Sequence, residues 1–343
     1  MLLQAQPTRR AMVVLNIAVI ASDELARDIA KPADQRDVHT YVHKENGPEG
    51  ARILSLIRPA KYPERLPPFL NALSTSQAGI IEVTAIDASL GEVLVAFASA
   101  GIQRGLAVIN PTDGGWVDED QVKMLFKQAG LASWTFEKND GVHLRERMYA
   151  LMDEIQSVLE ANANAPLVLP VDQHFNVKGV GLVAIGYVQS GSLSKHDEVE
   201  VLPASDVGVV RSLQVMDDDV EVAFSGDRVG VALRNLREQS LHRGCMICVP
   251  GDGALVGHES SSFDLELAPF QRKELSVGDV VHAASDLQFT VGRVSGLEGS
   301  SVVVEWDSPL WVRGDGSSRV LIVQLDAVPM RVMGRASNIQ KTG

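Results

Sequence analysis

The sequence contains little cysteine, and its two cysteines do not form a chemical motif. Cys245 and Cys248 are the only ones in 343 residues. A C-x-x-C pair can mark redox or zinc chemistry. Here residues 243–250 have the pattern of a strand, in which side chains three positions apart lie about 10 Å apart on opposite faces. A disulfide needs Cα atoms within about 7 Å, and zinc needs further ligands. We therefore expect two buried, unreactive thiols and no metal site.

Long hydrophobic runs are also absent. The longest nearly apolar segment, residues 12–21, contains Asn16 and reaches only about half the length that a membrane-spanning helix needs. The first ten residues are not followed by an apolar core of signal-peptide form. These observations predict a cytoplasmic protein without membrane contact.

Basic residues are in deficit throughout the chain. The net charge is -13, divided as -5 over residues 1–165, -4 over residues 166–250 and -4 over residues 251–343. No segment is therefore a simple basic nucleic-acid-binding domain, and we expect no DNA partner. A local patch could still bind RNA. From Trp311 onward the chain carries five basic and two acidic residues, which is a mild local reversal.

The first third of the chain alternates strand and helix patterns. Apolar strands are expected at residues 13–20, 38–43, 52–57, 79–86 and 105–109, and helices at 24–30, 64–73, 91–100, 118–129 and 142–161. Asp23 is expected to cap the first helix. This alternation is typical of a mostly parallel sheet covered by helices. We expect an α/β domain over residues 1–165.

After a linker at residues 162–166 the helical periodicity ends. Short strands rich in glycine and β-branched residues follow, with turn signals every 8–12 residues, as in barrels or sandwiches. A second break falls at residues 250–253. We therefore predict two small all-β domains, residues 166–252 and residues 253–343.

Glycine, valine and aspartate follow a fixed spacing over residues 172–199. The spacing resembles the opening of the second domain in the EF-Tu/SelB family of translation factors, D-x-x-F-x-V-x-G-x-G-x-V-x-x-G-x-V-x-x-G-x-L-x-x-G-D-x-V. Only the glycine before Asp197 is missing, and His196 stands there. Closely spaced glycines permit the bends that close a small barrel. We expect Phe175, Val177, Val183 and Val188 to fill its interior.

The resemblance continues on both sides of this segment. Residues 303–309, 313–316 and 330–334 are similar to runs in the third domain of the family, and the order of elements in residues 1–165 is similar to that of its GTPase domain. The chain also resembles the SelB-like, pyrrolysine-linked proteins of methanogenic archaea, including its Tyr62-Pro63 segment. The resemblance implies a degenerate P-loop GTPase-like domain followed by two EF-Tu-type barrels.

The phosphate-binding motif of the family is missing. A working site follows its first strand with G-x-x-x-x-G-K-[ST], whose backbone amides, lysine and hydroxyl bind phosphates and magnesium. Here only Ala21, Ser22 and Asp23 separate the first strand and helix, and no glycine precedes Gly47. The D-x-x-G motif is replaced by residues 58–63. We expect GTP and magnesium binding to be lost, and no catalytic residue.

The guanine-binding N-K-x-D motif survives in outline at residues 110–113. Asn110 and Asp113 remain, while Pro111 replaces the lysine. This segment is either a vestigial nucleotide-binding site or an ordinary β-turn. His39 and His43 form an i, i+4 pair on a predicted strand, without the glutamate of H-E-x-x-H, so a metal site is not expected there.

Three functions remain open from the sequence. The resemblance implies a translation-elongation-factor-like protein that binds tRNA or the ribosome without nucleotide cycling. A GTP-binding factor with an atypical site and a protein-interaction scaffold are the alternatives. The family's barrels bind the acceptor arm of tRNA, so basic residues of the barrels are the RNA-binding candidates, although each could also be an ordinary surface arginine: Arg211, Arg243, Arg313, Arg331 and Arg335.

Overall fold

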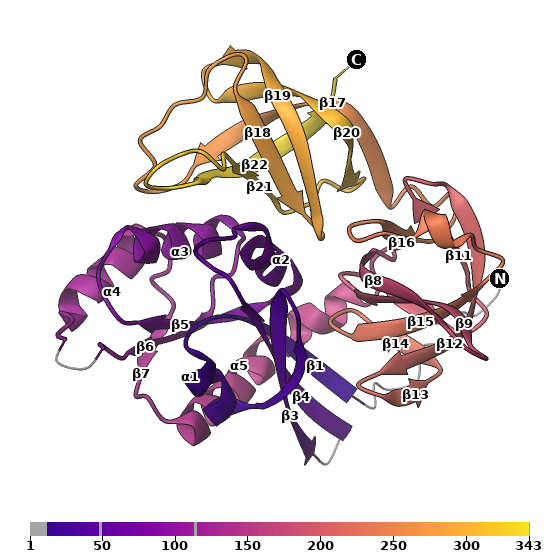
Figure 1. Cartoon of the computed structure of the whole chain (residues 1–343), viewed down its shortest axis with the longest axis horizontal. Coiled ribbons are helices and arrows are strands. Elements are labelled where there is room, and N and C mark those ends of the chain that lie inside the picture. Colours follow the sequence, from indigo (N-terminus) through magenta and orange to yellow (C-terminus); the bar gives the residue numbers. More distant parts are fainter. Residues whose placement is uncertain (1–11, 48–49, 113–114, 343) are drawn as a thin grey trace.

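The computed structural model describes residues 12–47, 50–112 and 115–342. They form three units: an α/β unit, a first barrel and a second barrel (Figure 1). The second barrel lies against the helices α2 (Pro67–Thr75) and α3 (Ala88–Ser99) of the α/β unit, and the first barrel lies beside the central strands β1 (Met12–Ile20) and β4 (Gly50–Pro59). In the described part of the chain, no helix combines the length and hydrophobicity that crossing a bilayer requires.

The α/β unit is built on a seven-stranded mixed sheet in the order β2-β3-β4-β1-β5-β6-β7. Its strands are β1 Met12–Ile20, β2 Lys31–Gln35, β3 Val38–Gly47, β4 Gly50–Pro59, β5 Ala78–Val83, β6 Gly105–Ile109 and β7 Thr135–Glu137. From β4 to β7 the neighbours run parallel, while β2, β3 and β4 are antiparallel. The predicted α/β pattern is thus confirmed.

Helices cover both faces of this sheet. They are α1 Asp23–Ile29, α2 Pro67–Thr75, α3 Ala88–Ser99, α4 Glu119–Gln128 and α5 Gly141–Asn162. One apolar core joins the sheet to α2, α3 and α4, and the other joins it to α1 and α5. In α5, which was expected at residues 142–161, the buried side chains Leu144, Met148 and Leu151 recur at helical spacing and form one apolar stripe.

Two strands and one helix start differ from expectation. The exposed edge strand β2 follows α1 directly, because Lys31-Pro32 begins a strand and does not merely end the helix. Proline is tolerated on such an edge, where its missing N–H costs no ladder bond. The short strand β7 was not expected, and α2 begins at Pro67, where prolines fit the first turn.

The first barrel is a closed antiparallel sheet in the order β11-β16-β8-β9-β15-β12, with β11 paired to β12. Its strands are β8 Leu169–Val177, β9 Gly181–Tyr187, β11 Glu198–Leu202, β12 Asp206–Val215, β15 Arg228–Arg234 and β16 Met246–Cys248. Three short strands, β10 Ser192–Ser194, β13 Asp218–Val220 and β14 Val222–Phe224, complete it, with the 3₁₀ turn η1 Glu238–Ser240.

The predicted interior of this barrel is partly wrong. Val188 lies in the core, but Phe175 is 41% exposed and Val183 is only half-buried. A bulge between Val171 and Gln173 shifts the pairing of β8 with β9. Because side chains alternate along a strand, such a shift turns the following residues to the other face. Leu182 and Ala184 fill the interior instead.

The second barrel is closed by β17-β20-β19-β18-β21-β22. Its strands are β17 Leu255–Leu267, β18 Val280–Ser285, β19 Gln288–Glu298, β20 Ser301–Arg313, β21 Val320–Val323 and β22 Val332–Lys341. The two closed barrels confirm the all-β prediction for the rest of the chain. Cys245 and Cys248 are free and buried, in two separate apolar cores, and burial raises their pKa values to about 11 and about 12.

A buried ion pair joins the α/β unit to the second barrel. Glu92 of α3 accepts hydrogen bonds from the backbone amide of Arg331, at 2.7 Å, and from its guanidinium. The two side chains are only 4% and 18% exposed. Tyr62 adds a third partner, because its hydroxyl donates to Glu92 at 3.1 Å. Burial, and then the nearby Glu92, raise the pKa of Tyr62, so this phenol stays neutral and can donate.

The first barrel is joined to the same sheet by a second buried contact. The side-chain amide of Asn16, in the middle of β1, donates to the carbonyl oxygen of Gly226 at 2.8 Å. Asn16, the polar residue within the apolar run of residues 12–21, therefore forms a contact between the α/β unit and the first barrel. Since a buried polar group without a partner costs about 1–3 kcal/mol, this bond also fixes the position of the barrel.

We predict that Arg331→Met destabilises the whole chain by about 3–5 kcal/mol, because it leaves Glu92 buried with an unpaired charge. Arg335→Met is the matched control, since Arg335 forms an exposed pair with Glu266 and should cost about 0–1 kcal/mol. Urea unfolding of the two variants measures the difference. Equal losses in both would contradict the prediction.

Candidate functional site

The connection from β1 to α1 is two residues long. Ala21 and Ser22 alone separate the two elements. Ser22 caps α1, because its hydroxyl accepts a hydrogen bond from the backbone amide of Leu25 at 3.2 Å. The expectation that Asp23 is the cap is therefore wrong. The Asp23 carboxylate is held by the Arg27 guanidinium and the Tyr41 hydroxyl, and these two hydrogen bonds lower its pKa.

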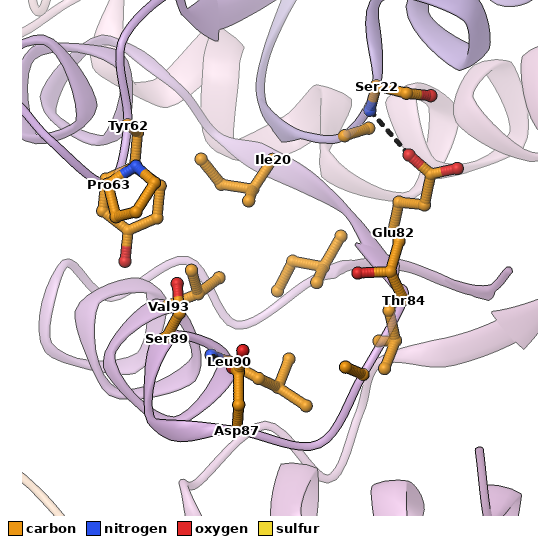
Figure 2. Close-up of a pocket in the computed structure, with 14 residues that line it drawn as sticks. Ile20, Ser22, Tyr62, Pro63, Glu82, Thr84, Asp87, Ser89, Leu90 and Val93 are labelled. Atoms are coloured by element: carbon orange, nitrogen blue, oxygen red, sulfur yellow. Dashed lines mark hydrogen bonds between the residues drawn. The ribbon is translucent and has the colours of Figure 1, made fainter. Parts of the chain in front are cut away.

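A carboxylate from the neighbouring strand β5 lies at the N-terminus of this helix. Glu82, the fifth residue of β5, accepts a hydrogen bond from the backbone amide of Ser22 at 2.6 Å. Figure 2 shows this bond at the edge of the pocket. The other oxygen of Glu82 accepts from the side-chain amide of Asn110, also at 2.6 Å. One carboxylate thus connects the ends of β1, β5 and β6.

This arrangement places an anion where phosphate-binding helices hold theirs. The N-terminus of a helix that follows a strand attracts negative charge through its free amides and its dipole. Glu82 supplies that charge from within the chain, and Asp23 and Glu24 add two more carboxylates in the first turn of α1. A phosphate group approaching this amide would meet like charge.

A pocket of about 340 Å³ opens beside this contact (Figure 2). It lies at the carboxyl ends of β1 and β5, the usual place for a ligand in an open α/β sheet. Apolar side chains such as Ile20, Leu90 and Val93 form much of its wall, and Glu82 and Asp87 are the charged groups among its described residues. Asp87 caps α3, accepting from the amide of Leu90 at 2.9 Å. No lysine or arginine among the described residues lines the pocket.

The far side of the pocket is formed by the segment after β4. Tyr62 and Pro63, joined by a cis peptide bond, line it. The carbonyl oxygen of Pro63 accepts from the guanidinium of Arg331 at 2.9 Å, and Arg58 donates to the carbonyl oxygen of Ala21 at 2.6 Å. Residues 58–63 are those predicted to replace D-x-x-G, and their hydrogen bonds tie them to the second barrel and to the end of β1.

The two vestigial nucleotide residues have different outcomes. Asn110 lies against Glu82 and does not line the pocket. Asp113 lies outside the described residues. Their role in nucleotide binding stays a prediction, although the Asn110 amide already has a partner within the chain.

Most of the candidate arginines are paired with carboxylates. Arg331 binds Glu92, Arg313 binds Asp286 at 2.9 Å, and Arg335 binds Glu266 at 2.7 Å. Arg211 donates to the carbonyl oxygen of Val180 in the turn after β8. Arg331 and Arg313 are each 18% exposed, so their charge faces inward. Arg211 and Arg335 are the more accessible of these four arginines.

Arg243 lies in a charged cluster between the sheet and the first barrel. It pairs with Asp37, at 2.5 Å, and with Asp172, at 2.9 Å. Arg228 lies beside it, with its Nε buried and without a partner among the described residues. These residues and Arg36 line a pocket of about 230 Å³. Acidic and basic groups are balanced there, so the cluster fixes two units against each other.

The two histidines of β3 differ: His39 Nδ1 is buried without a hydrogen-bond partner among the described residues, and His43 has a partner in α5. His43 Nδ1 lies 2.8 Å from the Tyr149 hydroxyl of α5, and desolvation, with Arg145 nearby, lowers its pKa. Across the described ranges, no three His, Cys, Asp or Glu side chains are grouped closely enough to hold a metal ion.

Sequence reasoning missed Glu82 and Glu92, which organise the site. One signal was available for each. Glu82 is the only charged residue in the otherwise apolar strand β5, and Glu92 is the only charged residue in α3. Charged side chains in such surroundings are rarely buried without a partner. Their partners, Ser22, Asn110 and Arg331, could not be identified from sequence distance.

Comparison with known proteins agrees with this geometry. Residues 181–248 match the model of elongation factor Tu domain 2. An uncharacterized protein of Methanocaldococcus jannaschii is 28% identical over 281 residues, which is 82% of each chain. The selenocysteine-specific elongation factor of the same organism is 26% identical over 210 residues, covering 56% of this chain and 44% of that factor. The chain thus aligns with less than half of that factor's length.

Two solved structures share the fold. Bacterial selenocysteine-specific elongation factor EF-Sec matches with a TM-score of 0.74 and 20% identity, over 95% of this chain and 57% of that one. SelB from Methanococcus maripaludis, in complex with the GTP analogue GppNHp, matches with a TM-score of 0.74 and 17% identity, over 95% and 79%. At these identities the likeness establishes the fold alone.

We predict that Glu82→Ala lowers the free energy of unfolding by about 1–2 kcal/mol, because the Ser22 amide and the Asn110 side chain lose their acceptor. Amide hydrogen exchange at Ser22 should accelerate at the same time. Glu119→Ala on α4 is the control, since it removes only an exposed pair with Lys123 and should change stability by no more than about 0.5 kcal/mol. Unchanged exchange at Ser22 would show that Glu82 does not hold this amide.

Proposed function

We propose that this SelB-like chain, with its elongation factor Tu domain 2, binds tRNA or the ribosome without binding or hydrolysing GTP. The observation that supports the loss of GTP binding is the hydrogen bond from the Ser22 amide to the Glu82 carboxylate. An internal anion stands at the helix end that would otherwise receive a phosphate. The chain would then act as a translation factor that has exchanged a nucleotide for a side chain.

The energetic argument follows from the missing contacts. Each charge-assisted hydrogen bond to a phosphate is worth roughly 1.5–3 kcal/mol. Here the glycine loop, its lysine and its hydroxyl are absent, and the pocket presents Glu82 and Asp87. Losing four or five contacts removes on the order of 7 kcal/mol, which is about five decades of affinity.

The contact between the α/β unit and the second barrel supports nucleotide independence. In a switching factor, a bound γ-phosphate must favour one of two arrangements to be effective. Here Arg331 ties the barrel to Glu92 of α3 and to Pro63 of the segment after β4. A buried pair of this kind holds a single arrangement whether or not a nucleotide is present.

The proposed binding of tRNA or the ribosome rests on the two barrels. Selenocysteine-specific elongation factors are among the relatives, and the match to elongation factor Tu domain 2 covers most of the first barrel. A net charge of -13 opposes polyanions at long range, so binding should be local and specific. Arg211 and Arg335 are the accessible candidates.

We predict that calorimetry with magnesium and GTP shows no binding at micromolar concentrations, and that GDP behaves alike. The reason is the occupied helix N-terminus and the acidic pocket. A dissociation constant in the micromolar range would contradict this and favour the alternative of a functional GTP-binding factor with an atypical site. Asn110→Ala would then decide whether the surviving asparagine takes part.

We predict that full-length protein retards tRNA on a native gel at low salt, equally with and without GTP. The logarithm of the affinity should fall with that of the salt concentration by about 0.7–0.9 per phosphate contact, with few contacts in total. The double variant Arg211→Glu, Arg335→Glu should bind at least tenfold more weakly. Asn110→Ala is the control that leaves binding unchanged.

Arg331 and Arg313 are left out of this test because their substitution would disturb buried ion pairs. If no tRNA is retarded by the unaltered protein, the ribosome remains to be tested by co-sedimentation with purified subunits. Failure in both assays would overturn the RNA half of the proposal and favour the protein-interaction scaffold.

A further inference from the structure

A third pocket lies at the opposite end of α3 from the pocket beside Glu82. It has a volume of about 330 Å³ and is formed by the C-terminus of α3, the segment between β20 and β21, and β22. Since α3 has 12 residues, its two ends are about 18 Å apart. The pocket therefore lies between the α/β unit and the second barrel and is separate from the vestigial nucleotide site.

The charge of this pocket is positive, in an acidic protein. Arg319 and Arg335 line it, and none of the described lining residues is acidic. Carboxylates that contact the lining residues have partners: Glu266 pairs with Arg335, Asp315 accepts from the backbone amide of Ser317 at 2.9 Å, and Asp264 accepts from the side-chain amide of Asn338 at 2.8 Å. Arg319 is the cation of the lining that is not paired with any of them.

Arg319 forms no hydrogen bond or ion pair with any other described residue. Partial burial, and then the neighbouring Arg313 guanidinium, lower its pKa, while Asp286 opposes this. The residue as a whole is exposed to solvent. Asp286 is already bound by Arg313 at 2.9 Å. Arg319 stays charged at any working pH, so its guanidinium is an uncompensated set of donors beside the pocket.

Neutral donors complete the lining. Ser318 accepts a hydrogen bond from the amide of Arg313 at 2.6 Å, which leaves its own hydroxyl hydrogen for another partner. Ser99, at the end of α3, also lines the pocket. A guanidinium with adjacent hydroxyls is the donor set that phosphate oxygens accept from.

One feature of the pocket opposes an anion. The C-terminus of a helix carries a partial negative charge. In α3 this end is satisfied, because the amides of Ala100, Gly101 and Ile102 donate back to its last carbonyl groups. Gly101 adopts a φ of 72°, as such a helix end requires. The carbonyl oxygens of Ala96, Phe97 and Ala98 therefore accept hydrogen bonds from these amides, which reduces their repulsion of an anion in the pocket.

We propose that this pocket binds a small anion through a phosphate group, held by Arg319 and assisted by Arg335 and Ser318. The volume is at the lower end of the range for small-molecule sites, so the ligand is inorganic phosphate or a small phosphorylated molecule. Its occupancy links the α/β unit to the second barrel, and it stabilises their contact by mass action. The pocket is separate from the one beside Glu82; it shares Arg335 with the RNA-binding candidates, whereas Arg319 belongs to this pocket alone.

The experiment is a titration of the full chain with inorganic phosphate and, separately, with glycerol 3-phosphate, followed by backbone amide shifts and by thermal unfolding. Sodium chloride at matched ionic strength is the reference. We expect saturable shifts at Gly316, Ser318 and Gly101 and a rise in melting temperature beyond that in chloride. The tighter of the two ligands identifies whether the free ion or its ester is preferred.

Arg319→Gln should weaken binding at least tenfold while melting at the same temperature as the unaltered protein in chloride. Arg272→Gln, an exposed arginine of the same barrel outside the pocket, should bind normally. The proposal is overturned if chloride gives the same shifts, if neither ligand saturates, or if Arg319→Gln binds as well as Arg272→Gln.

Discussion

The arrangement of the α/β unit and the second barrel depends on the buried contact between Glu92 and Arg331. These residues are 239 positions apart, and their pairing removes both charges from water at the junction of the α/β unit and the second barrel. A buried charge is tolerated only with a partner, so separation of the two units would expose or strand both groups. Tyr62 donates a hydrogen bond to Glu92, and Pro63 accepts one from Arg331, so the segment after β4 is bound to the same ion pair.

The same physical solution recurs at the end of β1. A carboxylate of the chain, Glu82, accepts hydrogen bonds from the Ser22 amide and the Asn110 side chain. At both places one carboxylate of the chain joins segments that are far apart in the sequence.

The sequence predicted the order of elements well, because strand and helix periodicity in residues 12–162 and the glycine spacing in residues 172–199 are local signals. It failed at Phe175, where a bulge in β8 changes the register by one residue. It also could not find the organising contacts, since Glu82, Glu92 and Arg331 meet only through the tertiary fold. Arg331 was an RNA-binding candidate as a basic residue of the barrels, and the structure places its guanidinium against the buried Glu92.

If the buried pair of Glu92 and Arg331 holds the α/β unit against the second barrel, these units keep one arrangement with or without nucleotide. Spin labels on the exposed residues Lys127 of α4 and Glu298 of β19, each changed to cysteine, would report the distance between the α/β unit and the second barrel. The native cysteines are buried and should not react. Pulsed electron-electron double resonance should give one narrow distance distribution, unchanged by magnesium and a non-hydrolysable GTP analogue. A second label-to-label distance, or a change in the distance on adding the analogue, would show that the two units do not keep a single arrangement.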